Sequence, residues 1–199
     1  MTSQPETLVG LLRRRALLES GQTAYTFLTD SKETKITYGE LDERARAIAA
    51  LLQDREAYGD RVLLLYPAGL EFISAFLGCL YAGAIAVPAY PPKLNRTPQK
   101  LQGILIDAQI KIALTTTQVR SRTMALFADV PGLDQLKWLA TDHLDLDAAG
   151  EWSHPMVEGN TTALLQYTSG SVTAPKGVIV THSNLLHNQA MISSAFQQT

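Results

Sequence analysis

The sequence predicts an α/β fold, layered, with a largely parallel sheet flanked by helices. Two observations lead to this class. Short apolar or β-branched runs alternate with helical patterns along most of the chain, and this order is typical of parallel sheets. The run RVLLLY at residues 61–66 is almost continuously apolar, as strands covered on both faces are.

Composition limits the function classes. The chain has 199 residues, 46% of them hydrophobic and 18% charged, which is enough for one globular domain with a sizeable core. A net charge of −2 offers no field that would attract nucleic acid. The single cysteine, Cys79, lies between apolar residues and is expected to be a core residue in a reducing compartment. The polar start lacks the pattern of a signal peptide, so we expect a cytoplasmic location.

The first elements follow from capping and periodicity. Thr7 can cap a helix over residues 8–18, whose expected inner face is Leu8, Leu11, Leu12 and Ala16. The basic cluster Arg13-Arg14-Arg15 is interpreted as a solvated face. Strands are expected at 24–28 and 35–38, with a polar turn at 30–34 between them. Thr37 and Glu40 form a capping box for a helix that reaches about residue 54.

A long uncharged stretch follows the strand at 61–66. From Phe72 to Pro92 no residue is charged, which is nominally enough to cross a bilayer. Gly83 and Pro88 interrupt the stretch, and we therefore predict a buried helix at 70–82 and a strand at 84–89. No transmembrane segment is expected.

The second half continues the alternation. Helices are predicted at 98–109 and 118–128, and strands at 110–115 and 136–140. The acidic segment 141–160 is interpreted as an irregular surface connection. A helix over 183–196 ends the chain.

The segment with most chemical information lies between the strand-like runs 164–167 and 178–181. It is a loop of small, hydroxylated and glycine residues that ends in Pro175-Lys176-Gly177. Hydroxyls and backbone N–H groups can donate to phosphate oxygens, and a lysine can reach them as a mobile charge. The segment is not a Walker A motif, because Lys176 is followed by Gly177 rather than Ser or Thr. Since such loops are also common as plain turns, that alternative stays open.

These residues resemble a known family. Tyr167-Thr168-Ser169-Gly170-Ser171, followed by Pro175-Lys176-Gly177, resembles the phosphate loop of the adenylate-forming enzymes: acyl-CoA synthetases, luciferases, peptide-synthetase adenylation domains and fatty acyl-AMP ligases. The lead-in Leu165-Gln166-Tyr167 and the stretches THSNLLHN (181–188) and AGAIAVPAYPP (82–92) are most similar to the fatty acyl-AMP ligases. The resemblance runs from about residue 8 to the end. It departs at Val172, where the family normally has Thr or Ser, and at Thr173, often Gly; Val172 removes one hydroxyl donor.

The resemblance implies a reaction and a site. ATP and a fatty acid would give acyl-adenylate and pyrophosphate, and the acyl group would pass to an acyl carrier protein. The implied phosphate-binding residues are Thr168, Ser169, Gly170, Ser171, Val172, Thr173, Lys176 and Gly177. Mg²⁺ would be required, but neither its ligands nor a catalytic residue is identifiable here. Residues 1–199 would form the N-terminal part of an AMP-binding domain. In the family the adenine, ribose and magnesium segments and the C-terminal lid come later, so we expect these residues alone to be inactive.

Other interpretations remain. Within the class, the chain could belong to an acyl-CoA synthetase or a peptide-synthetase adenylation domain. A non-catalytic nucleotide- or acyl-binding fragment is a different class, favoured by Val172. A Rossmann-type binder is disfavoured, because no Gly-x-Gly-x-x-Gly follows an early strand. His182 follows the loop closely and could approach a phosphate, although a helix-start residue satisfied by local backbone is the simpler interpretation.

Overall fold

The elements follow one another in the predicted alternation. A computed structural model describes residues 6–30, 32–92, 99–126, 132–168 and 175–196. In chain order the elements are α1 (Leu8–Leu18), β1 (Thr23–Leu28), β2 (Glu33–Thr37), α2 (Tyr38–Gln53), β3 (Arg61–Leu65), α3 (Leu70–Tyr81), β4 (Ile85–Ala89), α4 (Gln99–Asp107), β5 (Ile112–Thr115), α5 (Thr117–Leu126), β6 (Lys137–Ala140), the 3₁₀-helix η1 (Leu146–Glu151), β7 (Thr162–Tyr167), β8 (Gly177–Thr181) and α6 (His182–Ala195).

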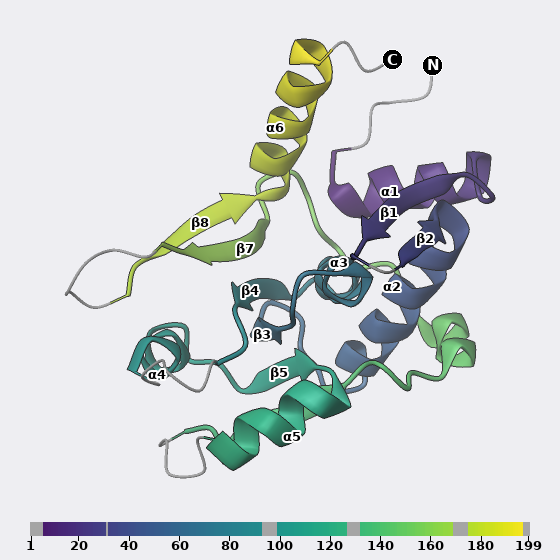
Figure 1. Ribbon diagram of the computed structural model, residues 1–199. Helices are drawn as coiled ribbons and strands as arrows, with labels where there is room; N and C mark the ends of the chain where they lie inside the picture. The colour runs from purple at the N-terminus through teal and green to yellow at the C-terminus, as the bar shows by residue number, and fades with distance from the viewer. Residues whose placement is uncertain (1–5, 31, 93–98, 127–131, 169–174, 197–199) are drawn as a thin grey trace.

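A six-stranded sheet forms the centre of the molecule (Figure 1). Its strand order is β6-β5-β3-β4-β7-β8, and every neighbouring pair is parallel except β7 and β8. The layered α/β class with a largely parallel sheet is therefore confirmed. Because β4 and β5 lie on opposite sides of β3, the chain changes direction across the sheet after β4.

The pleat of the strands divides the interior into two cores. Alternate residues of β3 point to opposite faces, so that Val62 and Leu64 join one core while Leu63 and Leu65 join the other. The first core packs against α1, α2 and α3, and the second packs against α4. All four leucine and valine side chains are fully buried, which confirms the strand that the apolar run predicted.

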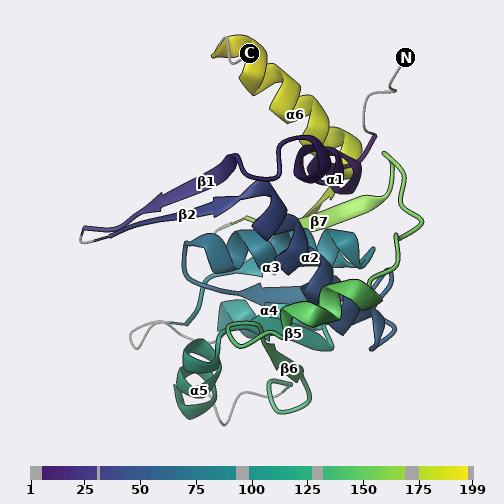
Figure 2. The same ribbon diagram turned by 90° about the vertical axis from the view of Figure 1, so that its right-hand side faces the viewer.

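Two hairpins extend from this body. The antiparallel pair β1–β2 forms a separate sheet that projects to one side (Figure 2). The β7–β8 hairpin and α6 extend from the edge of the main sheet (Figure 1), and His182 is the only buried residue of α6. The predicted capping box between Thr37 and Glu40 is present at the start of α2.

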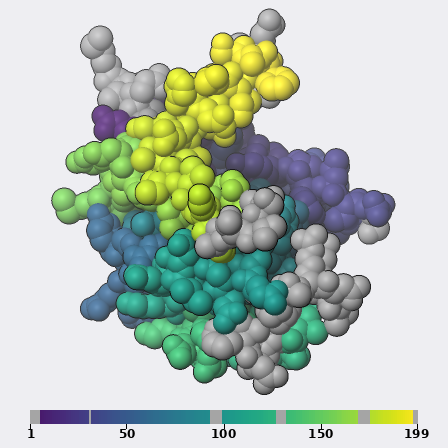
Figure 3. Space-filling model, turned by 90° about the vertical axis from the view of Figure 1, so that its left-hand side faces the viewer, coloured from purple at the N-terminus to yellow at the C-terminus, as the bar shows by residue number. Residues whose placement is uncertain are grey.

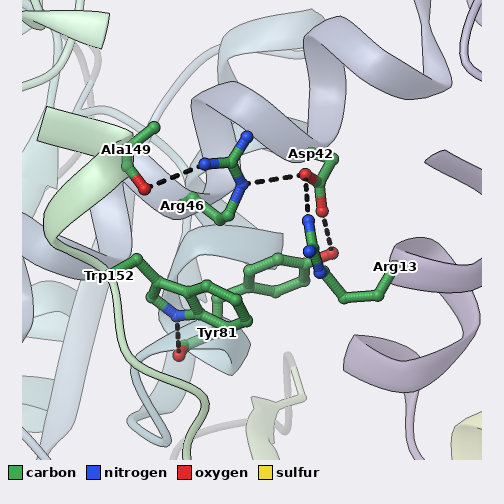
Figure 4. A network of polar contacts seen from close by, with 6 residues as sticks. All are labelled: Arg13, Asp42, Arg46, Tyr81, Ala149 and Trp152. Atoms are coloured by element: carbon green, nitrogen blue, oxygen red, sulfur yellow. Dashed lines mark hydrogen bonds and ion pairs between the residues drawn. The ribbon is translucent and has the colours of Figure 1, made fainter. Parts of the chain in front are cut away.

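Residues 141–160 are mostly exposed and irregular, as interpreted, but they are not a loose connection. The segment contains η1, and the indole of Trp152 packs 5.2 Å from the Tyr81 ring and donates to the Tyr81 carbonyl at 2.8 Å (Figure 4). Arg46 donates to the carbonyl of Ala149 at 2.9 Å. Buried apolar contacts and these bonds therefore fix the segment against α2 and α3.

The interpretation of the arginine cluster was wrong for Arg13. Its guanidinium donates to the buried carboxylate of Asp42 at 2.6 Å and lies 5.3 Å from the centre of the Trp152 ring (Figure 4). The buried residues of α1 are Val9 and Leu12, so that of the four expected inward residues only Leu12 is buried and the other three are half-buried.

The uncharged stretch is a helix and a strand, as predicted. Residues Leu70–Tyr81 form α3, Gly83 follows it with a φ of 70°, and Ile85–Ala89 form β4. None of the described helices is both long and apolar enough to cross a membrane.

Candidate functional site

The described ends of the predicted phosphate loop lie where β7 meets β8. β7 runs parallel to β4 and ends at Tyr167, so Thr168 leaves the sheet at the edge where ligands of parallel sheets bind. Tyr167 pairs with Gly177 at the end of the β7–β8 ladder. The loop thus begins and ends at one point, with Thr168 and Lys176 as its first and last residues.

The described part of the loop offers two free polar groups. Thr168 and Lys176 are exposed, and neither side chain bonds to another described residue. Five predicted site residues, Ser169, Gly170, Ser171, Val172 and Thr173, lie outside the described residues. Their assignment to phosphate stays a prediction.

Gly177 is required at the base of the loop for a steric reason. A Cβ atom there would lie 3.0 Å from the Tyr167 ring, closer than ordinary van der Waals contact. The absence of a side chain lets the two strands close directly beneath the loop.

Tyr167 connects this base to the rest of the molecule. Its ring is buried, and its hydroxyl donates to the carboxylate of Asp107 at the end of α4. Burial and then the Asp107 carboxylate raise the pKa of Tyr167, against the opposing effect of Arg61, to about 12. The hydroxyl therefore stays protonated and remains a donor. Sequence reasoning missed Asp107, because no local pattern links two residues 60 positions apart.

His182 lies away from the loop. It follows the far end of β8, five strand residues beyond the loop, or roughly 17 Å at about 3.4 Å per residue. Its ring is buried, and Nδ1 accepts the backbone N–H of Leu8 at 3.4 Å. Burial lowers the pKa of His182, so the neutral ring is favoured. The residue is structural, as the simpler interpretation held, but its ring bonds to the distant α1 rather than to local backbone.

A cavity of about 130 Å³ lies elsewhere, at the end of β6 on the side of α2 and α3. Its lining includes Glu71, Ser74 and Asp142. Ser74 is buried, and its hydroxyl has no hydrogen-bond partner among the described residues. Because β6 and β7 are separated by three strands, this cavity is not part of the loop site.

The described residues contain no cluster of potential metal ligands. Among the described residues, no three His, Cys, Asp or Glu side chains are placed to hold a metal ion. The Asp145 carboxylate caps η1 by accepting the N–H of Asp147 at 3.0 Å.

Comparisons with known proteins identify relatives of the chain. The family described as AMP-binding enzyme matches residues 12–199. The chain is 42% identical to the medium-chain-fatty-acid–[acyl-carrier-protein] ligase JamA of Moorena producens, over 99% of its own length and 35% of that protein. It is 34% identical to the long-chain-fatty-acid–AMP ligase FadD23 of Mycobacterium tuberculosis, over 97% of its length and 34% of that protein.

A solved structure shows the same fold. The fatty acyl-adenylate ligase of Legionella pneumophila, in complex with acyl adenylate and pyrophosphate, superposes with a TM-score of 0.90 at 40% identity. The match covers 98% of this chain and 34% of that protein. The chain therefore spans about a third of the length of these relatives.

Proposed function

Because the chain belongs to the AMP-binding enzyme family, we propose that it forms the N-terminal part of a fatty acyl-AMP ligase. The observation that carries the proposal is its 40–42% identity, over nearly its whole length, to proteins named as fatty-acid ligases. The end of β7 at the carboxyl edge of a parallel sheet, where Thr168 begins the loop, supports a nucleotide substrate.

The proposed reaction activates a carboxylate. A fatty acid oxygen attacks the α-phosphorus of ATP, a new oxygen–phosphorus bond forms, and the bond to the β-phosphate breaks. The products are an acyl-adenylate and pyrophosphate. Negative charge grows on the departing pyrophosphate, and the Lys176 ammonium with the hydroxyls of Thr168, Ser169, Ser171 and Thr173 would neutralise it. Backbone N–H groups of Gly170 and Gly177 would assist.

Mg²⁺ is the metal expected with ATP in such chemistry, where one or two carboxylates and the substrate phosphates usually hold it, and the described residues do not identify its ligands. They contain no cluster of three acidic, His or Cys side chains that could hold an ion.

The acceptor and the location complete the proposal. The name of JamA specifies an acyl carrier protein as acceptor, and we propose the same class of acceptor here, with a cytoplasmic location. An acyl-CoA synthetase is the second candidate, and release of acyl-CoA would favour it. A non-catalytic binding fragment is the third.

Lys176 gives the direct test. A charge-assisted hydrogen bond contributes about 1.5–3 kcal/mol, so Lys176→Met should weaken ATP binding by about 10- to 150-fold. Isothermal titration of ATP into the 199-residue chain measures this. Lys111→Met, which removes another exposed ammonium, is the matched control and should bind as the unaltered chain does. Equal affinity in Lys176→Met would refute the phosphate assignment.

A second experiment addresses the fragment alternative. Sequencing the gene beyond the codon for Thr199 shows whether the frame continues into the remaining segments of the family. A stop codon at that point would favour a binding role over catalysis.

A further inference from the structure

Both ends of the predicted phosphate loop contact the same helix. At the start of the loop, the Tyr167 hydroxyl donates to the Asp107 carboxylate. At its end, the Pro175 ring lies against Gly103, where an added Cβ atom would be 2.6 Å from Cγ and 3.0 Å from Cδ of the proline. Figure 3 shows the surfaces of α4 and of the β7–β8 hairpin meeting on this side of the molecule.

The two contacts come from one face of α4. Gly103 and Asp107 are four residues apart and therefore lie above one another on the helix. Their spacing allows one face to hold both ends of the loop.

The helix itself is anchored firmly. Its opposite side buries Leu101, Ile104 and Leu105 in the second core. Beyond its C-terminus, the Arg61 guanidinium donates to the Ala108 carbonyl at 2.8 Å and to the Gln109 side chain at 3.0 Å. These bonds fix α4 to the first residue of β3, at the centre of the sheet.

We propose that Gly103 and Asp107 are positioning residues that hold the two ends of the Thr168–Lys176 loop in register for binding the polyphosphate of ATP. This inference rests on the proposed function for its ligand. Phosphate donors act only when placed within fractions of an ångström, and neither residue needs to touch the ligand to set that placement. Gly103 acts through its missing side chain, because Pro175 is a rigid ring with no way to fold aside.

Gly103→Ala separates positioning from stability. Alanine is a better helix former than glycine. If Gly103 mattered only within α4, Gly103→Ala would leave the melting temperature unchanged or raise it. The added methyl group must also displace Pro175 and with it Lys176. A misplacement near 1 Å can cost about 100-fold in a well-ordered site, and we expect pyrophosphate and ATP to bind at least about tenfold more weakly. Gly150→Ala is the control, since a Cβ there meets nothing within 4 Å.

Asp107 provides an independent variant. Asp107→Asn keeps the shape but weakens acceptance from Tyr167, and Tyr167→Phe removes the donor from the other side. Each variant should weaken pyrophosphate binding. Combining them should add little, because both remove the same hydrogen bond between Tyr167 and Asp107. Asp134→Asn, at an exposed turn residue, is the charge control.

Hydrogen exchange gives a measurement that needs no ligand. In Gly103→Ala, and in Asp107→Asn, amides at the end of the β7–β8 ladder around Gly177 should exchange about tenfold faster, while those of β3 should not change. If the unaltered chain binds neither ATP nor pyrophosphate, the assignment of phosphate to the loop in this chain fails, and accelerated exchange still supports the positioning role. Unchanged exchange around Gly177 in both variants would overturn that role whatever the ligand.

Discussion

Asp42→Ala should destabilise the protein more than any exposed charge substitution. The Asp42 side chain is 4% exposed and joins three elements. It accepts Arg13 at 2.6 Å, Arg46 at 2.9 Å and the Tyr81 hydroxyl at 2.9 Å (Figure 4). These bonds tie α1 and α3 to α2, and Arg46 continues the connection to η1.

The size of the effect follows from what removal leaves behind. Removing one partner of a buried ion pair typically costs about 3–5 kcal/mol. Arg13 and Arg46 keep 31% and 24% side-chain exposure, so water partly hydrates their charges when the carboxylate is gone. We therefore expect the lower end, a loss of about 3 kcal/mol in the free energy of unfolding. For a chain of this length that corresponds to a fall of roughly 6–12 °C in melting temperature.

Guanidinium denaturation followed by circular dichroism measures the change. Glu33→Ala, which breaks an exposed pair with Lys35, is the control and should cost less than about 1 kcal/mol. A loss below about 1 kcal/mol for Asp42→Ala, with an unchanged slope against denaturant, would show that the network contributes little.

Two further predictions concern buried titratable groups. Burial holds the pKa of His182 below its ordinary value of 6.5, so the unfolded chain takes up a proton first as the pH falls. The contribution of the neutral His182 ring to the free energy of unfolding is therefore complete above pH 6.5 and declines below it. Denaturation midpoints at pH 7.5 and 5.5 should thus differ less in His182→Gln than in the unaltered chain, whereas a variant of the exposed His187 should behave as the unaltered chain does. Burial also raises the pKa of the Cys79 thiol, so the folded chain should resist a disulfide reagent at pH 8 until denaturant is added; rapid labelling without denaturant would contradict the buried position.

Local patterns predicted most elements of the sheet and its helices. The run at residues 61–66 has the nearly continuous apolar character of strands buried on both faces, and it forms β3. The strand predicted at 110–115 is β5, Ile112–Thr115. The start of α2 could be predicted from capping chemistry, because the side chains of Thr37 and Glu40 bond to each other's backbone N–H groups within one turn.

The errors occurred where distant residues decide the outcome. Arg13 was interpreted from its basic neighbours, yet its position depends on Asp42 and Trp152, which lie on other elements. Residues 141–160 were interpreted correctly as exposed from their acidic composition, but their anchoring through Trp152 to Tyr81 was missed. The same limit applies to the site. The loop could be located from the strands that flank it, whereas its contacts with Gly103 and Asp107 depend on the tertiary fold.

The two faces of the sheet serve separate purposes. On one face, Asp42 holds α1, α3 and η1 around the first core, far from the loop. On the other face, the second core holds α4, and α4 contacts the loop. Because β3 separates the two cores residue by residue, a change in one should reach the other only weakly. Asp42→Ala should therefore lower the melting temperature without altering pyrophosphate affinity at 25 °C. Gly103→Ala should weaken pyrophosphate binding without lowering the melting temperature. If the two effects could not be separated in this way, the loop would depend on the stability of the whole domain rather than on α4.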